Sequence, residues 1–393
     1  MKPLSGKTAT FTESVIREMT RLCVAAGGLN LAQGFPDFEA TAELKQAAID
    51  AITRGLNQYP ITHGEPALRQ AIAAKALRYN GMPVDPDTEI TVTCGATEGM
   101  VATLTALINP GDEVVVFEPF YENYGPDSIL SGATPRYVTL HAPDWHIDPG
   151  ELRAAFTPQT KAIIINTPNN PTGKVFTRDE LSLIAELCQQ WDAYAVTDEI
   201  YEHILYDGAQ HLSLATLPGM AQRTITVNSI SKTYSVTGWR VGWTIAAPAI
   251  TRQIRKVHDF LTVGAPTPLQ HAAAAALAFP DSYYDKLSAF YQDARDRTFG
   301  MLQAIGLDCS NPAGAYYILA DASRLMRSFG VADDVALSCE LLRRVGVAAV
   351  PGSSFYAGDQ GRTLIRFTFC KKPETLDAVE RALRPLAGTL GPE

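Results

Sequence analysis

Short apolar runs alternate with longer amphipathic stretches through the middle of the chain. Five runs predict β-strands: residues 113–118 (EVVVFE), 161–166 (KAIIIN), 193–198 (AYAVTD), 224–229 (TITVNS) and the shorter 91–94 (TVTC). Between them lie helical patterns such as residues 178–190, where Thr177 and Glu180 have the spacing of a capping box. Strands that alternate with helices are typical of βαβ units. The pattern therefore predicts an α/β fold with a mostly parallel sheet.

The pattern changes after about residue 280. Residues 282–305 predict a long amphipathic helix, and short strands are predicted at 315–319 and 364–369. We therefore expect a large domain over residues 41–280 and a smaller α+β domain made of residues 1–40 and 281–393. Two domains also suit a chain of 393 residues.

Composition and charge narrow the class of protein. The 33 basic and 42 acidic residues give a net charge of −9, which disfavours nucleic acid or an anionic membrane as a partner. No stretch approaches the roughly 18 consecutive apolar residues of a membrane span, and the N-terminus lacks the apolar core of a signal peptide. The six cysteines and seven histidines are scattered without metal-ligand spacing. These features predict a cytoplasmic protein with reduced thiols and no metal site.

Chemically versatile residues follow the predicted strands. Ligands of open parallel sheets bind beyond the carboxyl ends of the strands, so these residues are the candidates for a site. They are Gly95, Ala96, Thr97, Tyr121, Asn170, Asp198, Tyr201, Ser229 and Lys232. A helix start suits a phosphate, an aromatic ring can stack on a planar cofactor, and a desolvated lysine can form a Schiff base. A carboxylate can hold a protonated pyridine nitrogen. Together they predict a site for a flat, phosphorylated, nitrogen-containing ring.

Each candidate also has a plainer interpretation. A lysine after a strand is usually a solvated surface group, and Asp198 alone is best interpreted as a helix N-cap. Tyr121 alone fits a core position, and residues 169–173 (NNPTG) fit a tight turn. The hypothesis of a site therefore depends on these residues meeting at one edge of one sheet.

Three ordered motifs carry a family resemblance: residues 167–173 (TPNNPTG), 196–201 (VTDEIY) and 229–243 (SISKTYSVTGWRVGW). They resemble the fold-type I pyridoxal-phosphate enzymes, and within these the class I/II aminotransferases. Residues 30–40 (NLAQGFPDFEA) and 118–124 (EPFYENY) are similar to the kynurenine/glutamine and methionine aminotransferase branch. The resemblance covers about residues 11–383. It implies an aspartate aminotransferase-like fold, with a seven-stranded-type sheet in a large domain that binds pyridoxal 5′-phosphate.

The resemblance also implies roles around the cofactor ring. Lys232 resembles the lysine that bonds to the cofactor and later moves the substrate's α-proton. Asp198 would pair with the pyridine nitrogen, and Tyr201 and Asn170 would hydrogen-bond the phenolic oxygen. Tyr121 lies where the family stacks an aromatic side chain on the ring.

By the same resemblance, five residues would hold the phosphate. They are Gly95, Ala96 and Thr97 at the start of a helix, Ser229 at the end of a strand, and Arg240. Tyr59 resembles the tyrosine that reaches the phosphate of the neighbouring subunit. The resemblance therefore implies a homodimer with shared active sites.

The resemblance also implies how the substrate is bound, through a segment near the C-terminus. Arg366, in the segment LIRFTF, resembles the arginine that takes the α-carboxylate of the substrate as a bidentate pair, completed by Asn170 and the backbone of Gly34. On its own, Arg366 is best interpreted as a strand arginine paired with some carboxylate. Residues 258–270 offer no second arginine for a side-chain carboxylate, which favours apolar or aromatic substrates, with Phe11, Tyr59 and Tyr121 as candidate walls.

The expected activity is a ping-pong transfer of an amino group from an L-amino acid, with an apolar, aromatic or sulfur-containing side chain, to a 2-oxo acid. A β-lyase of the cysteine-conjugate type is the alternative, because it would use the same Lys232, Asp198 and Arg366. A ligand-sensing regulator is disfavoured, because such proteins carry a basic DNA-binding module ahead of this fold. A Rossmann dehydrogenase is disfavoured because no G-x-G-x-x-G follows a strand.

Overall fold

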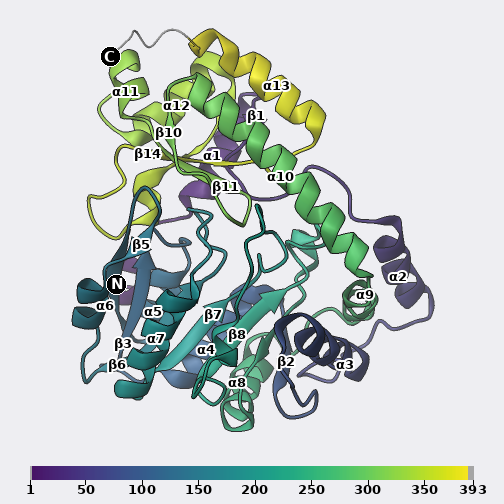
Figure 1. Ribbon diagram of the computed structural model, residues 1–393. Helices are drawn as coiled ribbons and strands as arrows, with labels where there is room; N and C mark the ends of the chain where they lie inside the picture. The colour runs from purple at the N-terminus through teal and green to yellow at the C-terminus, as the bar shows by residue number, and fades with distance from the viewer. Residues whose placement is uncertain (1, 388–393) are drawn as a thin grey trace.

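The centre of the protein is an eight-stranded sheet in the order β2-β9-β8-β7-β6-β3-β4-β5 (Figure 1). The structure is a computed structural model and describes residues 2–387. The strands are β2 (Ile90–Thr93), β3 (Glu113–Glu118), β4 (Thr134–His141), β5 (His146–Ile147), β6 (Thr160–Asn166), β7 (Tyr194–Asp198), β8 (Thr224–Ser229) and β9 (Gly242–Ile245). Strands β4, β3, β6, β7 and β8 pair in parallel, and β9 and β5 pair antiparallel with their neighbours. The predicted mostly parallel sheet is confirmed.

All five strands predicted for this sheet are present, with β3 and β8 at the predicted bounds. Strand β9 was not predicted, because it is short and begins with a glycine, which weakens the signal of a strand. Gly242 is needed there, since a Cβ would lie 2.6 Å from the backbone nitrogen of Ala96. This close approach packs β9 against the start of the helix that follows β2.

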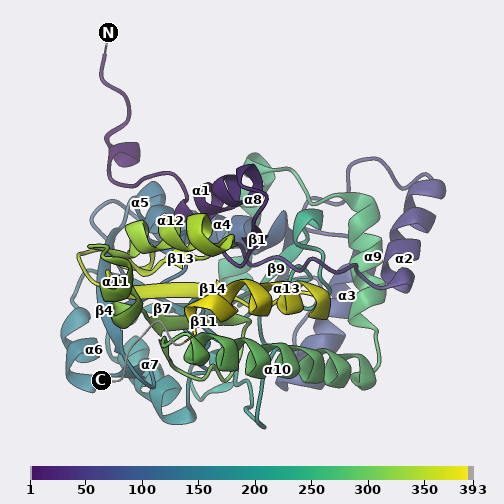
Figure 2. The same ribbon diagram turned by 90° about the horizontal axis from the view of Figure 1, so that it is seen from above.

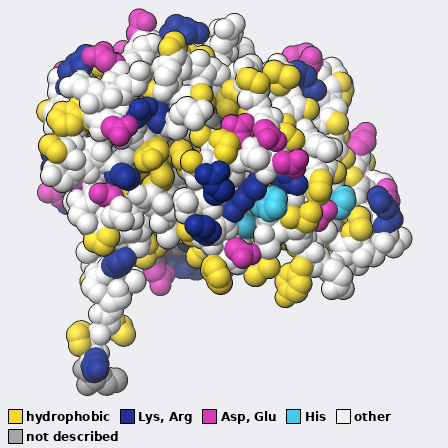
Figure 3. All heavy atoms as spheres, turned by 90° about the horizontal axis from the view of Figure 1, so that it is seen from below, with side chains coloured by type: hydrophobic (Ala, Val, Ile, Leu, Met, Phe, Trp, Pro, Cys, Tyr) yellow, Lys and Arg dark blue, Asp and Glu magenta, His cyan; other side chains and the backbone are white. Residues whose placement is uncertain are grey.

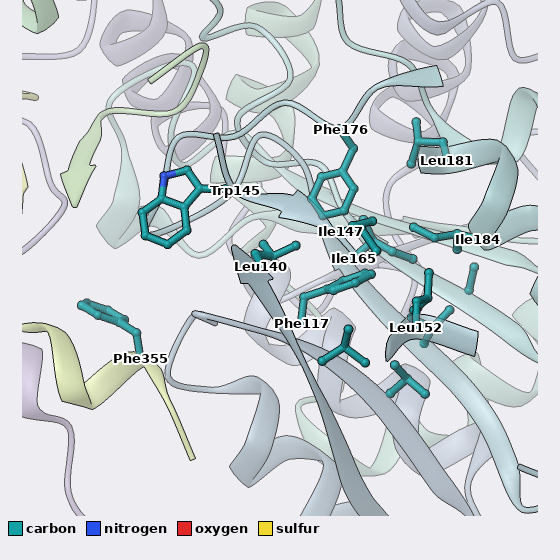
Figure 4. Packing of buried hydrophobic residues seen from close by; sticks show 14 of the residues in the cluster. Phe117, Leu140, Trp145, Ile147, Leu152, Ile165, Phe176, Leu181, Ile184 and Phe355 are labelled. Carbon is teal, nitrogen blue, oxygen red and sulfur yellow. The ribbon is translucent and has the colours of Figure 1, made fainter. Parts of the chain in front are cut away.

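Helices cover both faces of the sheet. They are α3 (Pro66–Lys75), α4 (Gly95–Leu107), α5 (Tyr124–Ser131), α6 (Pro149–Ala155), α7 (Arg178–Gln190), α8 (Pro248–Leu261) and α9 (Thr267–Leu277). Helix α2 (Ala42–Thr53) packs on α9. Along β3, Val114 and Val116 pack in one apolar cluster, and Val115 and Phe117 pack in another, as the two-residue period of a strand requires. The second cluster is shown in Figure 4, where Phe117 lies among aliphatic and aromatic side chains from the neighbouring strands and helices.

Helix α7 confirms the predicted capping box. The Thr177 side chain accepts a hydrogen bond from the backbone of Glu180, and the Glu180 side chain accepts one from the backbone of Thr177. Helix α4 begins at Gly95, two residues after β2. Its first turn is therefore made by Gly95, Ala96 and Thr97, the residues that the sequence indicated for a phosphate.

A second, four-stranded sheet lies above the first in Figure 1, in the order β10-β11-β14-β13. Its strands are β10 (Asp308–Cys309), β11 (Tyr317–Asp321), β13 (Val350–Pro351) and β14 (Leu364–Thr368), and β1 (Leu29–Asn30) pairs with β12 (Val347–Ala348). Helices α1 (Val15–Ala25), α10 (Asp281–Ala304), α11 (Ser323–Phe329), α12 (Asp334–Val345) and α13 (Pro373–Leu383) complete this part. From above, α10 and α13 lie beside β11 and β14, and the N-terminal segment projects from the body (Figure 2).

The long helix predicted at residues 282–305 is α10, shifted by one residue. The strand predicted at 315–319 begins two residues later, because Ala315 has a positive φ of 57° that interrupts extended backbone. The remaining short helices are Gly6–Ala9, Leu214–Thr216, Thr237–Trp239, Gly352–Phe355, Arg384–Leu386 and the π-helical Ala76–Asn80. Residues 1 and 388–393 of the predicted small domain lie outside the described residues, and the domain boundaries stay a prediction. In residues 2–387, the helices are too short or too polar to cross a membrane.

Candidate active site

A pocket of about 680 Å³, including its open mouth, lies at the carboxyl ends of β6, β7 and β8 and at the start of α4. It brings together most of the predicted site residues. Those that line it are Ala96, Thr97, Tyr121, Asn170, Asp198, Tyr201, Ser229, Lys232 and Arg240. Because parallel strands end at one edge of a sheet, residues distant in the sequence meet here.

Lys232 follows β8 by three residues and points its amine into this pocket. The Nζ atom donates a hydrogen bond to the backbone oxygen of Gly34 at 3.3 Å and lies 5.9 Å and 5.8 Å from the ring centres of Tyr201 and Tyr316. Burial lowers the pKa of Lys232 to about 8, although Asp198 acts in the opposite direction. A substantial share of the amine is therefore neutral, and nucleophilic, near physiological pH.

Asp198 is the last residue of β7 and is only 5% exposed. Its Oδ2 accepts a hydrogen bond of 2.7 Å from the hydroxyl of Tyr124, and its Oδ1 accepts one of 3.4 Å from the backbone of Ile200. Burial raises the pKa of Asp198 to about 6, and the Tyr124 hydrogen bond limits this rise. The interpretation of Asp198 as a helix N-cap is wrong, because turns and not a helix follow β7.

Asn166 connects the ends of β6 and β7. Its side-chain nitrogen donates to the backbone oxygen of Asp198 at 3.0 Å, and its Oδ1 accepts from the backbone of Asn170 at 2.7 Å. The Tyr201 hydroxyl lies 3.1 Å from that of Tyr317, which comes from β11. Asn166, Tyr124 and Tyr317 were not predicted as site residues. Asn166 and Tyr124 lie in segments next to the site candidates, whereas Tyr317 lies in a strand predicted for the other domain, at residues 315–319.

The start of α4 lies against Arg240. Gly95 has a φ of +80°, which favours glycine, and a Cβ at this position would lie 2.3 Å from an Arg240 nitrogen, so the guanidinium would have to shift. Arg240 itself has a positive φ of 55° and donates to the backbone oxygens of Thr237 at 2.9 Å and Cys94 at 3.5 Å. This exposed guanidinium thus lies beside the N–H groups of a helix start, which is a favourable place for an anion.

Hydroxyl groups extend this anion site. Ser229 ends β8, and its Oγ accepts a hydrogen bond of 3.3 Å from the backbone of Ser231. The Ser231 hydroxyl is buried in the pocket wall and has no partner among the described residues. A buried hydroxyl without a partner is uncommon in proteins, and a ligand oxygen would satisfy it. Arginine, hydroxyls and a helix start together are a donor set that fits a phosphate.

Charged residues beneath the pocket hold Ser229 in place. Asn228 accepts a hydrogen bond of 2.7 Å from the backbone of Ser229 and donates to the carboxylate of Glu202. Glu202 also accepts a hydrogen bond from Lys75. Burial acts to raise the pKa of Glu202, but the charges of Lys75, His203 and His211 together outweigh it, so this pKa falls to about 2. Ligand atoms of Glu202, Glu199 and His211 lie within 4.8 Å of one another, but Lys75 and Asn228 already occupy Glu202. Sequence reasoning missed this cluster.

Arg366, on β14, is fully buried. Its Nη1 donates to Oδ1 of Asn170 at 2.8 Å, and its Nη2 donates to the backbone oxygen of Ala32 at 2.6 Å. The rings of Tyr317 and Phe355 lie 4.3 Å and 4.9 Å from its Cζ. Within residues 2–387, no ion pair joins Arg366 to a carboxylate, so the interpretation as a carboxylate-paired strand arginine is wrong. A ligand carboxylate would be its first anionic partner.

Gly34 and Tyr59 lie in contrasting places. The backbone oxygen of Gly34 accepts from both Lys232 and the Tyr316 hydroxyl, and a Cβ at Gly34 would lie 1.9 Å from the Tyr317 hydroxyl. Tyr59 is 86% exposed and lines a separate hollow with residues 264–268. Phe11, one of the candidate walls, lines a third groove near Tyr356. The chain's own pocket therefore contains neither Tyr59 nor Phe11.

An enzyme that uses pyridoxal phosphate is the class of protein that this fold and this pocket define. A family model described as aminotransferase class I and II matches residues 26–383, and the chain belongs to this family. The predicted family, cofactor and fold are thereby confirmed: the protein is a pyridoxal-phosphate-dependent aminotransferase of the aspartate aminotransferase type, with an amino acid and a 2-oxo acid as its substrates.

Similar proteins differ in the substrates that their names give. The chain is 40% identical to the probable N-succinyldiaminopimelate aminotransferase DapC of Mycobacterium tuberculosis, over 96% of this chain and 97% of the relative. It is 37% identical to human kynurenine–oxoglutarate transaminase 1, over 93% and 94% of the two chains. The structure of YbdL from Escherichia coli, described as having a methionine aminotransferase function, superposes with a TM-score of 0.92 at 36% identity, over 98% and 100% of the chains.

Proposed function

We propose that this aminotransferase takes its amino group from an L-amino acid with an apolar, aromatic or sulfur-containing side chain and passes it to a 2-oxo acid in a ping-pong cycle. The observation that carries this proposal is the guanidinium of Arg366, which contacts Asn170 and Tyr317 of the pocket lining and has no carboxylate partner within residues 2–387. Among the described residues that line the pocket, the cations are Lys232 and Arg240, and both belong to the cofactor side. No lining cation is left for a second carboxylate. The kynurenine and methionine enzymes among the relatives support this choice.

Asp198 and Tyr124 would hold the ring of the cofactor. When bound, pyridoxal phosphate supplies an electron-withdrawing ring that makes the proton on the substrate's α-carbon removable. The Asp198 carboxylate would pair with the protonated nitrogen of this ring, and the Tyr124 hydroxyl fixes the direction of that carboxylate. Tyr201 and Asn170 would donate to the ring's phenolic oxygen, and Tyr121 would stack on its face. These contacts orient the ring toward Lys232.

Lys232 would carry the proton. Its amine would attach the cofactor, and a substrate amine would free it again. The free amine, a large share of which is neutral at a pH near 8, would take the proton from the substrate's α-carbon and deliver it again from the same face. The rings of Tyr201 and Tyr316 and the backbone oxygen of Gly34 limit the amine to a small volume, which keeps it within reach of that carbon.

Arg366 would orient the substrate. Its planar guanidinium can pair with both oxygens of an α-carboxylate, while Asn170 and the backbone near Gly34 complete the clamp. Full burial excludes water from this pair and strengthens it. The clamp would hold the α-carbon in a fixed position relative to the Lys232 amine.

The phosphate would be held at the start of α4, by the group proposed above for an anion: Gly95, Ala96, Thr97, Ser229 and Arg240. We also propose a homodimer in which Tyr59 completes this site in the partner subunit. The loop of Tyr59 lies beside apolar side chains that are unusually exposed: Ile61, Phe260, Leu261 and Val263. Figure 3, seen from the side of α8, shows hydrophobic side chains on the surface next to clustered Lys, Arg and His. An exposed apolar patch of this kind marks an interface.

A single-turnover experiment tests this proposal. The purified, pyridoxal-phosphate-loaded protein is mixed with one amino acid in the absence of an acceptor, and the absorbance spectrum and the released oxo acid are followed. Methionine, phenylalanine or kynurenine should each release one equivalent of oxo acid per site, and added 2-oxo acid should restore the first spectrum. Lys232→Ala should abolish turnover, while Lys256→Ala, an exposed lysine on α8, should leave it unchanged.

Three outcomes would contradict the proposal. Continuous release of pyruvate and ammonia without an acceptor would indicate the β-lyase. Turnover with N-succinyldiaminopimelate but with none of the apolar or aromatic amino acids would make the substrate assignment wrong, and the 40% identity to DapC makes that donor the necessary comparison. Normal turnover by Lys232→Ala would make the assignment of the lysine wrong.

A further inference from the structure

His258 is a fully buried histidine on α8 that the proposed mechanism does not use. Both of its ring nitrogens lie 2.6 Å from an oxygen: Nδ1 from Oε1 of Glu98, and Nε2 from the backbone oxygen of Thr62. A backbone carbonyl oxygen can only accept a hydrogen bond, so Nε2 carries a proton.

The proton on Nδ1 follows from the environment of Glu98. One carboxylate oxygen of Glu98 accepts from the backbone of Cys94, and the other accepts from the hydroxyl of Thr262 at 2.9 Å. Both oxygens of Glu98 thus accept hydrogen bonds from protein donors, an arrangement that suits a carboxylate, so we assign the Nδ1 proton to His258, which donates it to Oε1. The histidine is therefore a buried imidazolium. Burial alone lowers the pKa of His258, but the Glu98 carboxylate and the Thr62 carbonyl together raise it above the ordinary value.

This ion pair connects two segments that matter for different active sites. Glu98 lies in the first turn of α4, three residues after Gly95, at the end where the subunit's own phosphate would bind. Thr62 lies three residues after Tyr59, in the loop that would reach the partner's phosphate. The ends of this loop have other anchors, since Thr267 donates to Gln58 at 2.6 Å and the backbone of Glu65 donates to Gln270 at 2.8 Å. Its middle is held by His258 at Thr62 and by the backbone of Val92, which donates to the oxygen of His63 at 3.0 Å.

We infer that the His258–Glu98 ion pair is a positioning device, which fixes the start of α4 and the Tyr59 loop as one unit inside each subunit. This inference rests on the proposed roles of α4 and Tyr59 in phosphate binding. In the dimer, each phosphate would then depend on two such pairs, one behind its own α4 and one behind the Tyr59 loop of the partner. Loss of the pair weakens cofactor binding without the removal of any group that touches the cofactor.

The protonation state of His258 can be observed directly. The other titratable groups around it are Asp259 and Arg255 on α8, His63 beside Thr62 and Cys94 beside Glu98. Ring N–H protons in short buried hydrogen bonds give separate downfield proton resonances, which ¹⁵N-histidine labelling identifies. At pH 7, where an ordinary histidine is mostly neutral, the wild-type protein should show two such resonances from His258. One resonance only would overturn the inference.

Two variants assign these resonances. His258→Asn should lose both of them. Glu98→Gln should keep one, because the neutral amide can donate to Nδ1 while Nε2 still donates to Thr62. Retention of two resonances in Glu98→Gln would show that the carboxylate does not hold the second proton, and would overturn the ion pair.

A double-mutant cycle tests the connection to Tyr59. The dissociation constant of pyridoxal phosphate should rise about tenfold in Glu98→Gln, the effect of a buried hydrogen bond to a charged group. Tyr59→Phe alone should also weaken binding, and the double variant should be weaker by less than the product of the two factors. Independent factors would overturn the coupling. An unchanged constant in Tyr59→Phe would instead contradict the proposed role of Tyr59, while the resonances would still report on His258.

Ile184→Ala serves as the matched control. Ile184 lies on α7 in the apolar cluster of Figure 4, and its truncation destabilises the fold by creating a cavity. It should lower the melting temperature but leave the cofactor's dissociation constant unchanged. If Ile184→Ala weakened cofactor binding as much as Glu98→Gln at equal loss of melting temperature, the effect of Glu98 would be general destabilisation, and the positioning role would be wrong.

Discussion

The site contains two arginines in opposite surroundings. Arg366 is fully buried, between the rings of Tyr317 and Phe355, whereas Arg240 is exposed at the start of α4. Within residues 2–387, both arginines donate only to backbone or amide oxygens and pair with no carboxylate, so each can still bind an anion. An exposed charge attracts an anion from a distance, but dissolved salt screens this attraction. A buried charge is stabilised only by an anion whose shape and hydrogen bonds match the site. We therefore propose that Arg366 selects and orients its anion, and that Arg240 strengthens the binding of an anion already held by other donors.

The largest effect is expected at the buried arginine. A lysine at this position cannot donate to Asn170, Ala32 and a carboxylate in one plane, so Arg366→Lys should lower kcat/KM by roughly 10³-fold, in the range of a broken buried charge pair. Steady-state kinetics with methionine and phenylalanine measure this loss. The dissociation constant of pyridoxal phosphate should stay within about twofold. A loss below tenfold would mean that the two arginines contribute in similar ways.

A smaller effect is expected at the exposed arginine. Arg240→Gln should raise the dissociation constant of pyridoxal phosphate by about tenfold, the contribution of one hydrogen bond to a charged group, and should leave kcat at saturating cofactor nearly unchanged. Added salt should weaken cofactor binding more in the wild type than in Arg240→Gln, because exposed charges are screened. Equal salt dependence of the two proteins in equilibrium titrations would contradict the proposed electrostatic role.

The smallest effect is expected at Asp198, a buried carboxylate with a single hydroxyl donor. The Tyr124 hydroxyl favours the ionised form of Asp198, so Tyr124→Phe should raise the pKa of Asp198 further above its present value of about 6. The proposed pairing with a protonated ring nitrogen needs the ionised form of Asp198, so the acid limb of the pH profile of kcat/KM should move to higher pH. At pH 8 the loss should be only a few-fold. A shift of the acid limb to lower pH would show that Tyr124 does not support the carboxylate.

The topology of the sheet explains why much of the site could be predicted. Asp198 and Ser229 end parallel strands, and Asn170 and Lys232 follow such ends, so a correct sheet places them together without any knowledge of side-chain packing. The place of Arg366 could not be read in this way. It lies 196 residues from Asn170 and on another sheet, and only the family resemblance connected the two.

Other parts of the site depend on packing that a sequence does not display. Tyr124 and Tyr317 are aromatic residues in apolar surroundings, where a core role and a site role give the same pattern. The pair of His258 and Glu98 joins residues 160 positions apart through single hydrogen bonds, which leave no periodicity in the sequence. Strand β9 was hidden by its initial glycine, although that glycine is what allows α4 to approach the sheet.

The burial of Arg366 has a consequence for how this sequence was selected. A guanidinium without an anionic partner costs folding free energy, and replacement of such a group by an apolar side chain of similar size often stabilises a protein. Arg366→Met should therefore give a protein that is inactive yet melts at a higher temperature than the ligand-free wild type. A sequence optimised for thermal resilience alone would place a hydrophobe here. The arginine marks a position where natural selection has favoured activity over stability.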